Sequence, residues 1–240
     1  MSCSPKYNTN KRTCYSLRDL KDIANNYNKY SKDVIKLNQN KQKLYDDIIS
    51  ANYEKCRNNE FCWLKQNYMK INNDIEKFLE KFRPESPNTW NSNPKKWLNT
   101  YNLLDVMTQY EKKYKNFKFL GVHPLDFAFK NGDICISQNM CNLDISNMIK
   151  NKIYKIGNIF NLDKHYQTGS HWVSLFINLN TSSKNYGIYY YDSNGIGAPY
   201  EIKNFVSKII NDNKKLNNKK LNFYQNNIKH QFENSECGIF

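Results

Sequence analysis

The sequence has no apolar run long enough to cross a bilayer, and its first five residues, Met1 to Pro5, do not begin a secretory signal. Both absences predict a soluble intracellular protein with no membrane span. Histidine is scarce, with four residues in a chain of 240. No cofactor-binding motif is recognisable, so we expect no cofactor.

Cysteine occurs in a number and spacing that argue against a disulfide framework and against a zinc site. Seven cysteines are present, and an odd number is typical of a reducing compartment. Cys56 and Cys62 lie six residues apart, as do Cys135 and Cys141. This spacing is wider than that of a zinc knuckle, so we expect no metal.

Acidic residues are few relative to basic ones. Lysine and arginine total 36 against 22 aspartates and glutamates, a formal net charge of +14. Such an excess can indicate a nucleic-acid partner. However, the charge is spread through asparagine-rich segments and contains few arginines, which favours a solvated surface.

The first third of the chain predicts helices. Between about residues 16 and 81, apolar residues recur at helical spacing. One set runs from Leu20 to Leu44 through Ile23, Tyr27, Tyr30, Val34 and Leu37, and another contains Trp63, Tyr68, Ile71, Ile75 and Phe78. We therefore predict a helical arm over residues 1–83, followed by a linker over 84–94 that is rich in proline, serine and asparagine. The sequence does not choose between an arm that covers the active site, one that binds a substrate and one that only packs against the core.

The remaining residues, 95–240, mix helix and strand patterns. Helices are predicted near 100–115, after Asp144 and near 200–211, and strands over 117–122, 171–179, 186–193 and 221–225. This order predicts an α+β fold in which helices pack around a mainly antiparallel sheet.

Two of the predicted strands place a histidine beside an acid. In the segment from His171 to Leu179, alternate apolar residues fall on both faces, as in a strand buried on both sides. A polar turn follows, and the tyrosine-rich segment that ends at Asp192 returns as the second strand of a hairpin. The midpoint between His171 and Asp192 falls within the turn, so their side chains should lie close together at the open end.

Cys237 completes a possible thiol-protease set, because catalytic groups meet in space rather than in sequence. A helix start and a nearby histidinium would both lower the pKa of its thiol. Gln231, six residues earlier, could donate a hydrogen bond to a developing oxyanion.

Each of these residues also has an ordinary structural interpretation. A single cysteine is usually a small buried apolar residue, and a single histidine, such as His123 or His165, is usually structural or solvated. His230 shows no orienting partner in the sequence. Asp192 could be only a turn former before Ser193. The combination of the residues is more specific than any one of them.

The order of these motifs resembles the ubiquitin-like protease clan of cysteine peptidases. The clan includes SUMO-specific proteases, the adenovirus protease and the polyprotein-processing proteases of large DNA viruses. The nearest likeness is to the African swine fever virus polyprotein protease and its giant-virus relatives. The motifs that carry it are His171-Trp172, Asp192 after an aromatic strand, and Ile228-Lys229-His230-Gln231 leading into Glu236-Cys237-Gly238.

The resemblance implies roles for the residues. Cys237 would be the nucleophile, His171 the base, Asp192 its orienting acid and Gln231 an oxyanion donor. Trp97 and Trp172 resemble the tryptophans that form a narrow slot for a Gly-Gly dipeptide, although Thr100 stands where that motif has aspartate. In the clan the cysteine opens a long core helix, so a chain that ends at Phe240 predicts a truncated core.

The function implied is a viral cysteine endopeptidase that cleaves structural polyproteins or core precursors at Gly-Gly-Xaa sites. It would act in the viral factory of the host cytoplasm and in the virion. The alternatives are an isopeptidase acting on ubiquitin-like conjugates and a non-catalytic virion protein that binds DNA or a scaffold. Because the adenovirus relative uses DNA as an activator, weak DNA binding through the basic surface is a further expectation.

Overall fold

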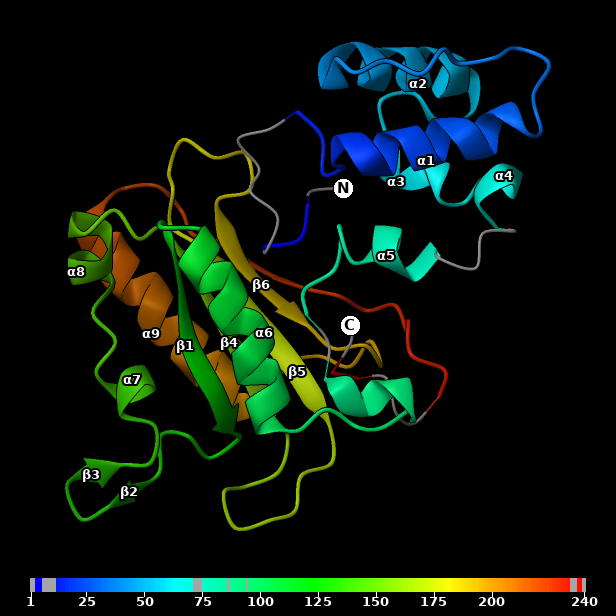
Figure 1. Ribbon diagram of the computed structural model, residues 1–240. Coiled ribbons are helices and arrows are strands. Elements are labelled where there is room, and N and C mark those ends of the chain that lie inside the picture. Colours follow the sequence, from blue (N-terminus) through cyan, green and yellow to red (C-terminus); the bar gives the residue numbers. More distant parts are fainter. Residues whose placement is uncertain are drawn as a thin grey trace. The chain divides into compact units, whose positions relative to one another are not determined.

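The computed structural model describes residues 3–5, 12–70, 75–85, 87–93, 95–233 and 237–238. The chain divides into two compact units, Met1–Ser86 and Pro87–Phe240, and each is described by itself (Figure 1). The division falls within the predicted linker, which also contains a short 3-10 helix, η1 (Asn88–Asn91).

The first unit consists of helices around its own apolar core. They are α1 (Leu17–Asn28), α2 (Lys41–Cys56), α3 (Glu60–Trp63), α4 (Asn67–Lys70) and α5 (Ile75–Leu79). Helix α1 begins where Ser16 and Asp19 form a reciprocal capping box, which satisfies backbone donors at the helix start. Leu20 and Ile23 then point into the core, where they are fully buried.

Part of the helix prediction is wrong. Helix α1 ends at Asn28, and Tyr30, Val34 and Leu37 lie outside any helix with exposed side chains. The second predicted helix is instead a set of short helices, and Ile71 lies outside the described residues. Apolar spacing alone did not reveal the polar break between α1 and α2.

The prediction that the cysteines form no disulfide framework is also wrong. All seven cysteines lie in the described part of the chain, and six of them form disulfides. The pairs are Cys3–Cys14, Cys56–Cys62 and Cys135–Cys141. Cys237 keeps a free, buried thiol.

The second unit is an α+β domain. Its helices are α6 (Thr100–Lys113), α7 (Gln138–Cys141), α8 (Ile145–Lys150) and α9 (Tyr200–Leu216). Its strands are β1 (Phe117–Pro124), β2 (Lys130–Asn131), β3 (Ile134–Cys135), β4 (Lys155–Asn161), β5 (Trp172–Asn178), β6 (Gly187–Tyr191) and β7 (Phe223–Gln225). The main sheet has the order β1-β4-β5-β6-β7, and β2 pairs with β3.

This sheet is mixed rather than mainly antiparallel. The pairs β4–β5 and β5–β6 are antiparallel, as the hairpin prediction requires, whereas β1–β4 and β6–β7 are parallel. Strand β4 was not predicted, because Gly157 and Asn158 interrupt its apolar pattern.

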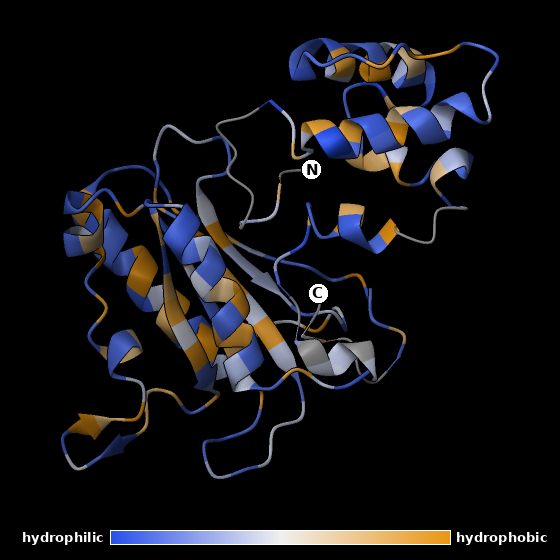
Figure 2. Ribbon diagram, in the orientation of Figure 1, coloured by the Kyte–Doolittle hydropathy of each residue, from blue (hydrophilic) through white to orange (hydrophobic). Residues whose placement is uncertain are grey.

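Helices cover the two faces of the sheet, with α6 on one side and α9 on the other (Figure 1). Figure 2 shows apolar residues along the strands and along one side of these helices. Leu175 and Ile177 of β5 point toward the α9 side and are buried with Ile202 and Ile209. The opposite face of β5 is open at Phe176, which is 37% exposed, so the strand is not buried on both sides as predicted.

Among the described residues, no helix is long and apolar enough to cross a membrane.

Candidate active site

His171 and Asp192 meet at the open end of the β5–β6 hairpin. His171 immediately precedes β5, and Asp192 immediately follows β6. The imidazole Nε2 and the Asp192 Oδ1 lie 2.7 Å apart. Ser174 pairs with Tyr191, so the next residue, Asp192, lies opposite Val173. Asp192 therefore reaches His171 diagonally across the hairpin rather than directly. The predicted register is thus displaced by two positions, which leaves both side chains on the same face.

Asp192 is fully buried and held by its own turn. Its Oδ1 also accepts a hydrogen bond from the backbone N–H of Asn194 at 2.7 Å. Asn226 fixes the backbone of the aspartate: its Oδ1 accepts from the Asp192 N–H, and its Nδ2 donates to the Asp192 carbonyl. The carboxylate therefore has a fixed position from which to orient the imidazole.

Cys237 lies against the other side of His171. Because Nε2 faces Asp192, Nδ1 is the ring nitrogen left for the hydrogen bond between the imidazole and the thiol. Gly238 brings this segment close to Leu98, since a Cβ at Gly238 would lie 3.0 Å from the Leu98 Cδ1. Cys237 and Gly238 form a turn. The rest of the helix predicted to begin at Cys237 falls on residues 239–240, which lie outside the described part of the chain.

The electrostatics favour a thiolate beside an imidazolium. The hydrogen bond to Cys237 raises the pKa of His171; burial opposes this shift, and Asp192 reinforces it. Burial by itself would raise the pKa of Cys237, but hydrogen bonds from His171 and from the backbone of Trp172 and Gly238 lower it below its ordinary value. The two shifts bring the proton affinities of thiol and imidazole toward each other.

Gln231 is buried beside the Asp192 turn. Its Oε1 accepts a hydrogen bond from the Ser193 hydroxyl at 2.7 Å, and its Nε2 donates to the Glu233 carbonyl at 2.6 Å. The structure therefore brings Gln231 to the same turn as Asp192, although 39 residues separate them in the sequence.

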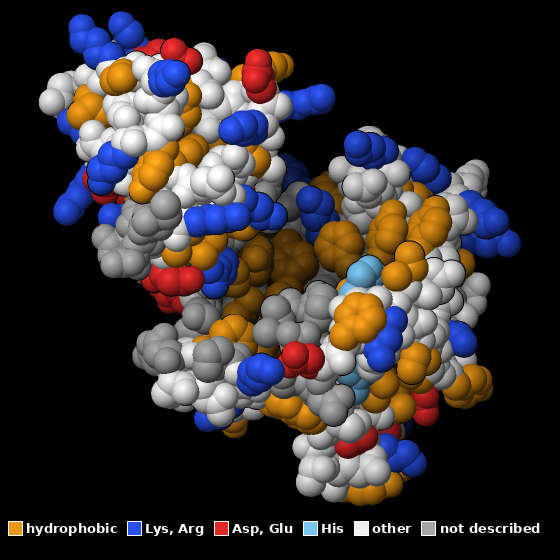
Figure 3. Space-filling view, turned by 90° about the vertical axis from the view of Figure 1, so that its right-hand side faces the viewer, with side chains coloured by type: hydrophobic (Ala, Val, Ile, Leu, Met, Phe, Trp, Pro, Cys, Tyr) orange, Lys and Arg blue, Asp and Glu red, His pale blue; other side chains and the backbone are white. Residues whose placement is uncertain are grey.

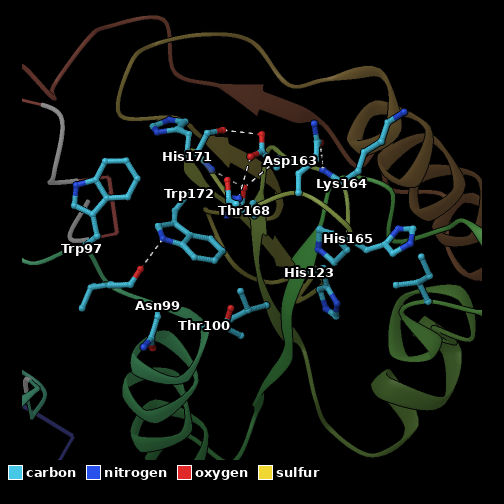
Figure 4. A pocket seen from close by; sticks show the side chains of 18 residues that line it. Trp97, Asn99, Thr100, His123, Asp163, Lys164, His165, Thr168, His171 and Trp172 are labelled. Carbon is cyan, nitrogen blue, oxygen red and sulfur yellow. Dashed lines mark hydrogen bonds between the residues drawn. The ribbon is translucent and has the colours of Figure 1, made fainter.

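Trp97 and Trp172 line one pocket of about 510 Å³ together with His171. Figure 4 shows the two tryptophans near one end of this pocket. The Trp172 indole Nε1 donates to the Leu98 carbonyl at 2.9 Å, which ties the strand to the segment before α6. Asn99 caps α6, and Thr100 is its first residue.

The other histidines occupy different surroundings. His123 is buried and bonds the Ser137 hydroxyl through Nδ1, and His230 stacks on Tyr191. His165 has an acid partner, because its Nδ1 lies 2.7 Å from the Asp126 Oδ2. His165 forms part of the pocket wall away from the tryptophans (Figure 4).

The sequence reasoning missed the polar residues that support the site. Ser193 and Asn194 bond the side chains of Gln231 and Asp192, and Asn226 bonds the Asp192 backbone. The Asp-Ser-Asn-Gly run was visible only as a turn signal, and nothing in the sequence indicates that Asn226 returns to it.

Comparisons with known proteins find similarity to thiol proteases. Residues 156–240 match the model of the Ulp1 protease family, C-terminal catalytic domain. The putative thiol protease R355 of Acanthamoeba polyphaga mimivirus is 28% identical over 262 residues, covering 99% of this chain and 81% of that protein. The crystal structure of the African swine fever virus pS273R protease has a similar fold, with a TM-score of 0.54 and 17% identity, over 99% of this chain and 81% of the viral protease. Residues 156–240, which include His171, Asp192, Gln231 and Cys237, are therefore similar to the catalytic domain of the Ulp1 protease family.

Proposed function

We propose that the protein is a cysteine endopeptidase that processes viral structural polyproteins or core precursors after small residues, at Gly-Gly-Xaa sites. The observation that carries the proposal is the series of contacts from Asp192 through His171 to Cys237. Cys237 has the only free thiol among the described residues, and it meets an imidazole held by a buried carboxylate.

The reaction follows from these contacts. The Cys237 thiolate attacks the scissile carbonyl carbon and forms a tetrahedral oxyanion. The His171 imidazolium then donates its proton to the leaving amine as the C–N bond breaks, which leaves an acyl-enzyme thioester. A water molecule gives its proton to His171, attacks the thioester and releases the carboxylic acid and the thiol. Asp192 stabilises the imidazolium and keeps the ring oriented.

Gln231 is proposed to stabilise the oxyanion together with the backbone N–H of Cys237. The amide nitrogen of Gln231 carries two N–H groups, of which the Glu233 carbonyl accepts one. A second N–H remains to donate to negative charge, and the loss of one such donor typically lowers kcat by about 10²–10³-fold.

The preference for small residues is proposed to come from Trp97 and Trp172. Trp172 directly follows His171, and its indole is held by the Leu98 carbonyl, so its position is fixed next to the proposed base. Trp97 is 49% exposed and lines the same pocket. Substrate residues with large side chains would collide with these rings, whereas glycine would pass between them.

The viral setting is proposed from the two similar viral proteins, a mimivirus thiol protease and an African swine fever virus protease. We further propose that the enzyme acts in the viral factory of the host cytoplasm and in the virion.

Cleavage of matched peptides tests the proposal. Fluorogenic peptides would differ only in the two residues before the scissile bond, with Gly-Gly, Ala-Ala and Val-Val compared at equal concentration. We expect cleavage of the Gly-Gly peptide at least tenfold faster than of the Val-Val peptide, and none with Cys237→Ala. Equal cleavage of all three peptides would contradict the proposal that Trp97 and Trp172 form a slot for small residues.

An isopeptidase is the second candidate, because the matched family is named for the Ulp1 protease. It would share the Gly-Gly preference, so peptides alone do not separate the two activities. Conjugates of ubiquitin-like proteins should be assayed beside the peptides. Rapid turnover of a conjugate without peptide cleavage would favour the isopeptidase.

Weak DNA binding is a secondary proposal. The formal charge is +14, and in the view of Figure 3 Lys and Arg side chains are scattered over both units, with acidic side chains among them. Binding of duplex DNA should weaken steeply as salt rises. A flat binding curve at low salt would contradict it.

A further inference from the structure

We propose that Ser193 is a positioning residue that fixes the side-chain amide of Gln231 in the orientation that presents its N–H to the oxyanion. This inference rests on the proposed function, in which Gln231 is the side-chain oxyanion donor. Nothing in the sequence patterns assigned a role to Ser193.

The contacts between the two residues are several and buried. Ser193 is 1% exposed and Gln231 is 5% exposed. The Ser193 hydroxyl donates to the Gln231 Oε1 at 2.7 Å, while the Ser193 carbonyl accepts from the backbone N–H of Gln231 at 2.9 Å. The same carbonyl accepts from the His230 N–H at 2.7 Å. Ser193 therefore holds both the backbone and the side chain of Gln231.

The Glu233 carbonyl and the Ser193 hydroxyl together hold the Gln231 amide in one orientation. An amide side chain can be turned by 180° with little change in shape, which exchanges its acceptor oxygen and its donor nitrogen. Here a donor, the Ser193 hydroxyl, faces Oε1, and an acceptor, the Glu233 carbonyl, faces Nε2. A turned amide would place Nε2 against the hydroxyl and Oε1 against a carbonyl oxygen, which would repel it. A turned amide would also bring Oε1 rather than an N–H toward the oxyanion.

The same turn also holds the base. Asp192 accepts from His171, and Ser193 follows it directly in the chain. Asn194 comes next, and its backbone N–H donates to the Asp192 Oδ1 at 2.7 Å. Consecutive residues of one turn thus set the position of the general base and that of the oxyanion donor, so the two groups move together or not at all.

Ser193→Ala tests the inference because it removes the hydroxyl alone. We expect kcat for peptide hydrolysis to fall by about tenfold to a hundredfold, less than or equal to the loss of a whole oxyanion donor, with KM little changed. A peptide aldehyde, whose adduct with Cys237 carries the same oxygen, should bind more weakly by a similar factor. Alkylation of Cys237 by iodoacetamide forms no oxyanion, so its rate should not change.

The alkylation rate separates positioning from general damage to the fold. Ser207→Ala is the matched control: this serine on α9 is exposed and its hydroxyl bonds the Lys203 carbonyl within the helix. It should leave hydrolysis, aldehyde binding and alkylation unchanged. If Ser193→Ala slows alkylation as much as hydrolysis, Ser193 only supports the structure and the inference is overturned.

Gln231→Ala distinguishes failure of the inference from failure of the proposed function. If Gln231→Ala leaves hydrolysis intact, Gln231 is not an oxyanion donor and the proposed function loses that role. If Gln231→Ala slows hydrolysis but Ser193→Ala does not, only the inference on Ser193 fails. In the double variant, Ser193→Ala should add no further loss, because the hydroxyl would have no amide to orient.

Discussion

Replacement of Gly195 by alanine should impair hydrolysis by displacing the Gln231 loop from the Asp192 turn. Gly195 has φ +72° and closes the turn by donating its N–H to the Asp192 carbonyl at 2.8 Å. A Cβ at this position would lie 2.8 Å from the Ile228 carbonyl carbon and 2.9 Å from the Lys229 nitrogen. Both are backbone atoms, so no side-chain rotation can relieve the contact.

The magnitude has a steric and a conformational part. Ordinary contact for a Cβ begins at 3.4 Å, so the segment at Ile228 must retreat by roughly half an ångström. This segment leads directly into Gln231. Misplacement of a catalytic group by about 1 Å can cost about 10²-fold in rate, so we expect kcat/KM to fall by about tenfold or more. The left-handed backbone adds about 1–2 kcal/mol of destabilisation for a residue with a Cβ.

Gly132→Ala is the matched control. Gly132 also has a left-handed backbone, with φ +62°, but a Cβ there would have no neighbour within 4 Å among the described residues. Both variants should lose similar stability in urea unfolding from the backbone effect, and only Gly195→Ala should lose activity beyond what its stability explains. Equal activity of the two variants, with both proteins folded at the assay temperature, would refute the reasoning.

Further predictions concern the Asp192–His171 pair, the buried His123 and the core. Asp192→Asn removes a charge that raises the pKa of His171, so the alkaline limb of the kcat/KM profile should move to lower pH; an unmoved limb would argue against this role. Burial lowers the pKa of His123 from 6.5 to about 4. Because the folded-state value is the lower one, stability is lost as pH falls from about 6.5 toward 4, by up to about 3 kcal/mol, and His123→Gln should flatten this loss in urea titrations at several pH values. Ile177→Ala, at a fully buried position, should cost about 2–5 kcal/mol in urea unfolding, whereas the neighbouring Phe176→Ala, on the open face, should cost less; equal costs would contradict the assigned faces.

The sequence could predict those parts of the fold in which one local pattern decides the structure. The hairpin that carries His171 and Asp192 is confirmed, because a polar turn between two β-prone runs leaves little choice of pairing. Helices α6 and α9 begin at Thr100 and Tyr200 as predicted, although α9 continues beyond the predicted end to Leu216.

The rest depends on contacts between distant segments. Strand β4 lies beside β1 and β5 in the sheet, and its glycine at 157 leaves room for the ring of Phe117, which no local pattern shows. Asn226 likewise reaches the Asp192 backbone only after the chain returns through β7. Polar residues such as these have no periodicity, so a sequence reveals their type but not their partner.

The reactivity of Cys237 as a function of pH tests the central claim most directly. Since the other six cysteines form disulfides, iodoacetamide without reductant reports on this thiol, and mass spectrometry locates the label. We expect rapid alkylation that persists well below the ordinary thiol pKa of about 8.5. In His171→Ala the pKa of the Cys237 thiol should rise toward that value. A thiol that titrates near about 8.5 in both proteins would contradict a thiolate held by His171.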